Sequence, residues 1–364
     1  MKMKYGIILG TRPEIIKLYP IIKHLENNNK EYFIIHTNQH YSENMDKIFF
    51  KELNLQPAKY NLNVGSHSHA KQTGLMLERL EEKHISENPD IVFIQGDTNT
   101  ALAGALVASK LKIKIAHVEA GLRSYDNNMP EEINRIIADH ISNYLFVPTK
   151  KQEQILLSEG ISQDKIFVVG NTIVDTLMAI ESISEQNSRI LEKLSLNPKE
   201  YFLATIHRQE NVDNKERFVS IFKGLSNVHE HSNKKIIYPI HPRALKMIRQ
   251  HEITIPEGIE LIDPVGYVDM IKLMKNCLCV LTDSGGIQEE SCILRVPCVT
   301  LRDNTERPET LEVKSNILAG ADPEKILQSV QYMIQSDRNW KNPFGEGDSG
   351  PKIIDMIENI WRVG

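Results

Sequence analysis

Several features that define common protein classes are missing from this sequence of 364 residues. No apolar run approaches the roughly 18 residues of a membrane-spanning helix. The N-terminal segment lacks the apolar core and the small-residue cleavage site of a signal peptide. The Walker A, G-x-G-x-x-G and H-E-x-x-H motifs are also absent. ATP, dinucleotide cofactors and zinc hydrolysis therefore lose their usual support.

Cysteine is scarce, and the chain has no excess of positive charge. The four cysteines, Cys277, Cys279, Cys292 and Cys298, include no C-x-x-C pair, so neither a zinc site nor a disulfide framework is indicated. We expect buried, reduced thiols in a cytoplasmic protein. The net charge of −5 argues against a general surface for nucleic acid or anionic membrane. An anionic ligand would need a local cluster of cations.

What the sequence does contain is a repeated alternation of apolar strands and amphipathic helices. A polar stretch without a strand, near residues 180–200, ends at Pro198 and separates two blocks of this alternation. Helices that alternate with strands connect parallel strands. We therefore predict an α/β protein made of two doubly wound domains. The clearest predicted strands are 32–37, 90–96, 113–120, 201–206, 235–240 and 277–283.

Ligands of doubly wound folds bind beyond the carboxyl ends of the strands, and with two such domains we expect a cleft between them. The first strand ends at Gly10, and "TRPEIIK" then opens a helix that carries Arg12 and Lys17 near its start. An arginine beside the positive end of a helix is unfavourable unless an anion binds there. The alternative is an ordinary solvated helix terminus.

Three carboxylates are predicted at the same edge of the first domain. Asp97 and Glu119 each follow a strand, and Glu131 opens a helix four residues before Arg135. Taken singly, Asp97 could be a helix N-cap, and Glu131 with Arg135 a surface ion pair. Taken together, the three would raise at least one pKa by mutual repulsion, as acid–base catalysis requires.

The second domain carries polar residues in the corresponding places. His207 and Arg208 follow one strand in "HRQEN", and His241 follows another in "HPR". Ser284, Gly285 and Gly286 lie where a strand passes into a helix, a turn whose free N–H groups can bind phosphate. A packing role is the alternative. An acid of "QEE" could accept hydrogen bonds from a ribose, and Arg302 or Arg307 could reach the same phosphates.

Seven segments together resemble the non-hydrolysing UDP-N-acetylglucosamine 2-epimerases. They are "GTRPEIIKL", "GDT", "EAGLRS", "PEEINR", "HRQEN", "SGGIQEE" and "RDNTERPE", in this order along nearly the whole chain. The resemblance implies a GT-B-like fold of two Rossmann-type domains with an interdomain cleft, residues 1–180 plus 351–364 and residues 198–348. The C-terminal helix would cross back to the first domain. It also implies a cytoplasmic homodimer that uses a UDP-sugar but no metal or nicotinamide.

The reaction implied is reversible C2 epimerisation of UDP-N-acetylglucosamine to UDP-N-acetylmannosamine, by anti elimination of UDP to 2-acetamidoglucal and re-addition. Asp97, Glu119 and Glu131 would be the acid–base group, with His207 assisting and Arg135 orienting. Lys17 would lie near the pyrophosphate and the catalytic edge. The resemblance assigns the binding of UDP to Arg12, Lys17, His241, Ser284, Gly285, Gly286, Glu290 and Arg307.

The chain departs from many bacterial members at two places. It reads "HRQEN" where they read "HRREN", and "QHYSENM" where they carry "QHREML". Both places lie near the second UDP-N-acetylglucosamine site that activates bacterial members. Candidate residues for such a site are Gln39, His40, Gln72 and Arg208.

Four other interpretations of the residues remain open. An epimerase of a modified substrate, with a 3-acetamido or uronic acid group, would share every motif. A GT-B glycosyltransferase would share the fold and the UDP site but would not need three acids, and neither would a non-catalytic sugar-nucleotide sensor. A hydrolysing epimerase usually has Ala-Asp or Ala-Glu where this chain has Pro13 and Glu14.

Overall fold

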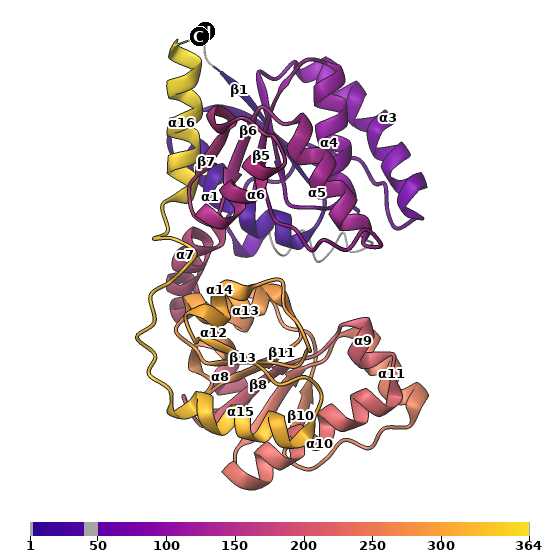
Figure 1. Ribbon diagram of the computed structural model, residues 1–364, viewed down its shortest axis with the longest axis vertical. Coiled ribbons are helices and arrows are strands. Elements are labelled where there is room, and N and C mark those ends of the chain that lie inside the picture. The colour runs from indigo at the N-terminus through magenta and orange to yellow at the C-terminus, as the bar shows by residue number, and fades with distance from the viewer. Residues whose placement is uncertain (1–2, 40–49, 364) are drawn as a thin grey trace. The chain divides into compact units, whose positions relative to one another are not determined.

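The computed structural model describes residues 3–39 and 50–363 (Figure 1). The chain divides into two compact units, Met1–Met178 with Phe344–Gly364 (unit 1) and Ala179–Pro343 (unit 2). The boundary between them falls inside helix α7 (Thr172–Asn187). The domain limits expected from the sequence remain a proposal.

Unit 1 is built on a parallel sheet of seven strands in the order β3-β2-β1-β4-β5-β6-β7. Its central strands are apolar on both faces because helices cover both sides of the sheet, and Ile7, Ile8 and Leu9 of β1 have no exposed surface. The strands are β1 (Lys4–Leu9), β2 (Glu31–His36), β3 (Tyr60–Asn61), β4 (Ile91–Gln95), β5 (Lys114–Val118), β6 (Tyr144–Val147) and β7 (Ile166–Val168). The helices are α1 (Arg12–Asn27), α3 (His69–Glu87), α4 (Asn99–Lys110), α5 (Pro130–Ile141), α6 (Lys150–Ser158), the 3₁₀ helix η1 (Gln163–Lys165), α7 and α16 (Ser349–Val363).

The C-terminal helix α16 returns to unit 1 and packs on α1 (Figure 1). Its residues Ile353, Ile354 and Ile357 are buried. The approach is close because Gly350 lacks a side chain: a Cβ there would lie 2.7 Å from Cβ of Pro20 in α1. The predicted return of this helix is therefore confirmed. Trp361, near the end of the helix, is 43% exposed.

Pro20 interrupts the hydrogen bonding of α1, and α7 compensates for it. Proline has no N–H, so the carbonyl of Ile16, four residues earlier, loses its helical donor. The hydroxyl of Thr176 donates to that carbonyl at 2.7 Å in a buried contact. This bond fastens α7 to α1.

Unit 2 is built on a parallel sheet of six strands in the order β10-β9-β8-β11-β12-β13. Phe218 and Phe222 of α10 lie in the core beside this sheet. The strands are β8 (Tyr201–Thr205), β9 (Lys235–Pro239), β10 (Ile259–Ile262), β11 (Val280–Thr282), β12 (Cys298–Thr300) and β13 (Asn316–Leu318). The helices are α8 (Ile190–Lys193), α9 (Gln209–Val212), α10 (Lys215–Ser232), α11 (Pro242–His251), α12 (Tyr267–Asn276), α13 (Gly285–Ile293), α14 (Pro308–Glu312) and α15 (Pro323–Gln335).

Each sheet reverses its strand order once, between β1 and β4 in unit 1 and between β8 and β11 in unit 2. Such a reversal leaves a crevice at the carboxyl ends of the two strands, which is where ligands of these folds bind. Two parallel sheets with flanking helices confirm the α/β class predicted from the sequence. All four cysteines are buried and free, as expected. Over the described residues, no helix is long and apolar enough to cross a membrane.

Candidate functional site

In unit 1 the turn after β1 owes its glycine to packing. A Cβ on Gly10 would lie 2.0 Å from Oγ1 of Thr37 and 2.5 Å from Oγ1 of Thr100, far inside contact distance. Arg12, predicted to bind phosphate, is the first residue of α1 and is partly buried. Glycine is therefore needed here for close packing against Thr37 and Thr100. Any contact between this turn and an anion would come from Arg12 and the N-terminus of α1.

Glu14, which the sequence indicated only as a difference from hydrolysing epimerases, has a role in this turn that its motif did not predict. Its side chain is fully buried and accepts hydrogen bonds from N of Gly10 at 2.9 Å and from the hydroxyls of Thr11 at 2.8 Å and Thr98 at 2.6 Å. Burial raises the pKa of Glu14 to about 7. Because Thr98 follows β4, Glu14 joins the two strands that flank the reversal of the sheet.

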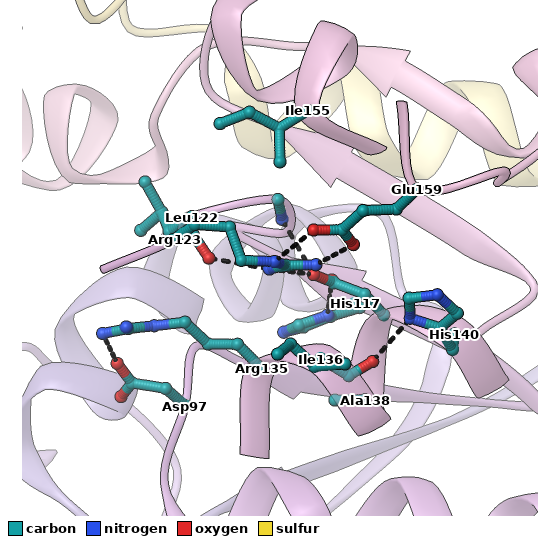
Figure 2. Close-up of polar contacts among 12 residues, drawn as sticks. Asp97, His117, Leu122, Arg123, Arg135, Ile136, Ala138, His140, Ile155 and Glu159 are labelled. Atoms are coloured by element: carbon teal, nitrogen blue, oxygen red, sulfur yellow. Dashed lines mark hydrogen bonds and ion pairs between the residues drawn. The ribbon is translucent and has the colours of Figure 1, made fainter. Parts of the chain in front are cut away.

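Asp97 lies in the turn between β4 and α4, as predicted. The N-cap of α4 is Thr98, whose hydroxyl accepts from N of Ala101 at 3.0 Å, so the helix-cap explanation for Asp97 is wrong. The carboxylate of Asp97 instead forms an ion pair with Arg135 (Figure 2). Arg135 also binds Glu132 at 2.8 Å. The expected role of Arg135 in orienting a carboxylate therefore has a definite partner in Asp97.

Glu119 directly follows β5 and has an unusual backbone conformation. Its φ of 65° lies in the left-handed region that residues other than glycine rarely adopt and that is enriched at functional sites. One carboxylate oxygen pairs with Nζ of Lys17 and the other accepts from the amide of Gln95, the last residue of β4. The side chains of Lys17 and Glu119 are 11% and 5% exposed. The structure thus pairs Glu119 of the predicted acid–base group with Lys17, which was expected near the same edge of the sheet.

Asp97 and Glu119 therefore follow adjacent strands, and Glu131 lies in the first turn of α5. Arg135 binds Glu132 and Asp97 rather than Glu131, so the surface pair considered from the spacing is not formed among the described residues. The carboxyl group whose pKa is raised beside this cluster is Glu14, and burial is the cause. Mutual repulsion within the cluster stays a prediction.

The corresponding place in unit 2 is organised by Asp283, which the sequence analysis also missed. Asp283 follows β11 and is fully buried. It accepts from N of His207 and N of Arg208 at 3.0 Å and 2.9 Å, and from the amide of Asn211 at 3.0 Å. Burial alone would raise the pKa of Asp283, but these contacts, with His207 first, lower it below its usual value. The signal was available, because Asp283 stands directly before "SGG" at the end of a strand.

The imidazole of His207 is held by the same carboxylate, with Nδ1 3.1 Å from Oδ1 of Asp283. The ring centroids of His207 and His241 are 5.7 Å apart. His241 is the N-cap of α11, where its Nδ1 accepts from N of Arg243 at 3.2 Å. The two predicted histidines of unit 2 are therefore neighbours at one edge of the sheet.

The predicted phosphate turn forms the N-terminus of α13, with Ser284 as the N-cap. Neither Gly285 nor Gly286 has a positive φ. An added Cβ would meet Oε2 of Glu306 at 3.6 Å from Gly285 and Oγ of Ser284 at 3.9 Å from Gly286, both ordinary contacts. Packing of the surrounding protein therefore does not require glycine at these two positions. Close approach of a ligand to the backbone would require it.

The remaining predicted groups of unit 2 contact other side chains. Glu290 accepts from the hydroxyl of Tyr267 at 3.0 Å, and Nε of Arg307 lies 2.8 Å from Oε1 of Glu289. Arg302, in the loop after β12, is bound by Glu210 and Glu306, both at 2.8 Å. The assignments of Glu290 to the ribose and of Arg307 to the phosphates stay predictions.

Two of the residues expected near an activating site form one hydrogen-bond network in unit 1. The amide of Gln72 donates to the carbonyl of Gln39 at 2.9 Å, and the side chain of Gln39 accepts from the hydroxyl of Thr100 at 2.8 Å. Arg208, in unit 2, is the N-cap of α9. His40 lies outside the described residues. A role of these residues in activation stays a prediction.

Among residues 3–39 and 50–363, no group of three or more His, Cys, Asp or Glu side chains could hold a metal ion.

The two sheets, with charged side chains where their strand orders reverse, define a two-domain, GT-B-like α/β enzyme. Comparison with known proteins narrows this class. A family model described as UDP-N-acetylglucosamine 2-epimerase matches residues 23–358.

Similar proteins agree with the family model. The UDP-N-acetylglucosamine 2-epimerase of Methanocaldococcus jannaschii is 57% identical over 361 residues, which cover 98% of this chain and 99% of that protein. The crystal structure of the Methanocaldococcus jannaschii UDP-GlcNAc 2-epimerase in complex with UDP-GlcNAc and UDP has a TM-score of 0.90 and 57% identity, covering 98% of this chain and 100% of that one. A Pseudomonas aeruginosa protein, UDP-2,3-diacetamido-2,3-dideoxy-D-glucuronate 2-epimerase, is 37% identical and covers 98% and 100% of the two chains. The chain belongs to the UDP-N-acetylglucosamine 2-epimerase family, as the motifs predicted.

Proposed function

We propose that this protein interconverts UDP-N-acetylglucosamine and UDP-N-acetylmannosamine at C2 of the sugar. The observation that carries the proposal is the pair of carboxylates, Asp97 and Glu119, at the ends of adjacent strands, each fixed by a basic residue. Family membership at 57% identity to a protein of that name supports the same substrate. We infer further that the protein acts as a cytoplasmic homodimer without metal or nicotinamide.

The reaction needs two things from the protein: acids and bases for the proton at C2, and groups that stabilise the departing diphosphate. In the elimination half, a carboxylate takes the C2 proton, C1 and C2 become doubly bonded, and the C1–O electron pair leaves with UDP. In the return half, the UDP oxygen attacks C1 of 2-acetamidoglucal, and a proton reaches C2 from the opposite face. Unit 1 supplies Asp97, Glu119 and Glu131 as acids and bases. Unit 2 supplies the N-terminus of α13, with His241 and Arg307, to stabilise the departing diphosphate, and Glu290 to bind the ribose.

The first experiment is proton NMR of the purified protein with UDP-N-acetylglucosamine in D₂O, without added nucleotide or metal. We expect a UDP-N-acetylmannosamine signal with deuterium at C2, because the proton removed exchanges with solvent before return. Release of free N-acetylmannosamine and UDP would instead indicate hydrolysis. No change after hours would overturn the proposed substrate.

A modified UDP-sugar is the second candidate substrate. It is favoured by the 37% identity to the Pseudomonas aeruginosa enzyme, whose name specifies a 2,3-diacetamido uronic acid. The same NMR experiment with that UDP-sugar would distinguish the two. A kcat/KM higher for the uronic acid than for UDP-N-acetylglucosamine would replace the first proposal with the second.

A further inference from the structure

A buried histidine that no motif singled out lies beneath the carboxylates of unit 1. His117 is in β5, two residues before Glu119, and is 1% exposed. Its Nδ1 lies 2.8 Å from Oδ1 of Asp139, and its Nε2 lies 2.9 Å from the carbonyl oxygen of Gly96. Both ring nitrogens are therefore within hydrogen-bond distance of an oxygen.

The two partners of His117 are both acceptors. A backbone carbonyl has no proton to donate, so Nε2 must carry the hydrogen of its bond to Gly96. Oδ2 of Asp139 already accepts from Nη1 of Arg123 at 2.7 Å and from N of Gly121 at 3.2 Å. Burial alone would raise the pKa of Asp139, but His117 and Arg123 lower it below its usual value. Asp139 is thus an ionised acceptor, and Nδ1 carries a hydrogen too.

The buried arginine of this network has two carboxylate partners. Arg123, whose side chain is 1% exposed, pairs with Asp139 at 2.7 Å and with Glu159 at 2.6 Å (Figure 2). A buried charge is tolerated when it is paired and hydrogen-bonded in this way.

The network touches every segment that carries one of the three proposed carboxylates. Gly96 is the residue before Asp97. His117 is two residues before Glu119. Asp139 belongs to α5, whose first turn holds Glu131. An apolar side chain in place of His117 could fill the same space in the strand, but it would leave the carbonyl of Gly96 without this donor.

We infer that His117 is a positioning residue for the proposed epimerisation. Its bond to Gly96 fixes the peptide that carries Asp97, and its bond to Asp139 fixes α5 relative to β5. The inference rests on the proposed function, because it assumes that these carboxylates act on the sugar. Misplacing a catalytic group by about 1 Å can cost on the order of 100-fold in rate, so the loss of one of these bonds should be visible in kcat.

Two substitutions separate the two bonds. In His117→Asn the amide nitrogen takes the place of Nδ1, keeping the donor to Asp139 and losing the donor to Gly96. In His117→Gln the amide nitrogen takes the place of Nε2, keeping the donor to Gly96 and losing the donor to Asp139. The control is His84→Asn, at a histidine that is also 1% exposed but bonds only within its own helix, to the carbonyl of Leu80 at 2.7 Å.

We expect His117→Asn to lower kcat by roughly 10- to 100-fold with little change in KM, because the groups of unit 2 proposed to bind UDP lie outside this network. His117→Gln should recover part of that loss. UDP affinity measured by calorimetry should be unchanged in both, and His84→Asn should lose stability without losing kcat. Wild-type kcat in folded His117→Asn and His117→Gln would overturn the inference, as would a fall in kcat no larger than that of His84→Asn at matched stability.

The protonation of the ring can be read without an activity assay. A ¹⁵N spectrum of histidine-labelled protein, assigned by the loss of one signal set in His117→Gln, should show two protonated ring nitrogens at pH 7.5. One unprotonated ring nitrogen would overturn the two-donor network. A wild-type protein that forms no UDP-N-acetylmannosamine would overturn the proposed function instead, and the spectrum would still decide the network.

Discussion

Nδ1 of His207 lies 3.1 Å from Oδ1 of Asp283, so a buried carboxylate orients a side chain predicted to assist the reaction. The contact spans the point where the sheet of unit 2 reverses its strand order, because His207 follows β8 and Asp283 follows β11. A carboxylate in this position selects the tautomer with hydrogen on Nδ1 and leaves Nε2 to act as the acceptor.

Asp283→Asn should therefore lower kcat. The asparagine can donate to Nδ1 and favour the other tautomer, and the expected loss is about 10- to 1,000-fold, within the range of general acid–base assistance. Steady-state kinetics by NMR provides the measurement. Asp322→Asn is the control, because Asp322 caps α15 and asparagine caps equally well. An unchanged kcat in a folded Asp283→Asn variant would remove His207 from the mechanism.

Glu14 should make the free energy of unfolding depend on pH. Its pKa is about 7 in the folded protein against an ordinary value of 4.5, so between these values the folded state binds more protons than the unfolded state. The contribution of Glu14 is complete below pH 4.5 and is lost as the pH rises to 7, by roughly 3 kcal/mol in total. Urea unfolding of wild type and Glu14→Gln at pH 5 and pH 8 tests this. The variant should gain relative to wild type at pH 8, and parallel pH profiles would contradict the assignment.

Thr176→Val should destabilise unit 1 without altering the chemistry. The valine keeps the shape of threonine but removes the donor to the carbonyl of Ile16, which Pro20 has already left without a helical partner. An unsatisfied buried carbonyl costs about 1–3 kcal/mol. Thr176→Ser keeps the hydroxyl and should lose much less. Thermal unfolding of the pair gives the comparison, and equal Tm values would show that water or another group replaces the bond.

Gly285→Ala should weaken UDP binding but leave stability nearly unchanged. The added Cβ would meet the protein only at the ordinary distance of 3.6 Å, yet it would stand where a phosphate approaches the backbone. Gly224→Ala is the opposite case, because its Cβ would lie 2.6 Å from Cδ1 of Ile326. Gly224→Ala should lower Tm and leave UDP affinity unchanged. Wild-type UDP affinity in Gly285→Ala would show that phosphate does not bind at this turn.

The sequence by itself determined the α/β class, the return of the C-terminal helix and the family. Strand and helix periodicity are local properties, and the strand-end motifs "GDT", "EAGLRS" and "SGGIQEE" place polar residues at one edge of each sheet whatever the packing. The same reasoning predicted Asp97, Glu119 and His207 as candidate residues. It could not determine which side chain each of them contacts.

Only the tertiary structure decided those partners. Lys17 and Glu119 are 102 residues apart in the chain, yet they form a buried ion pair. Spacing suggested Glu131 as the partner of Arg135, but the structure gives Asp97 and Glu132. The roles of Glu14, His117 and Asp283 escaped notice, although Glu14 was noted as a family difference and Asp283 stands directly before "SGG". Their properties arise from burial and from acceptors or donors brought together by parallel strands, which periodicity along one segment cannot reveal.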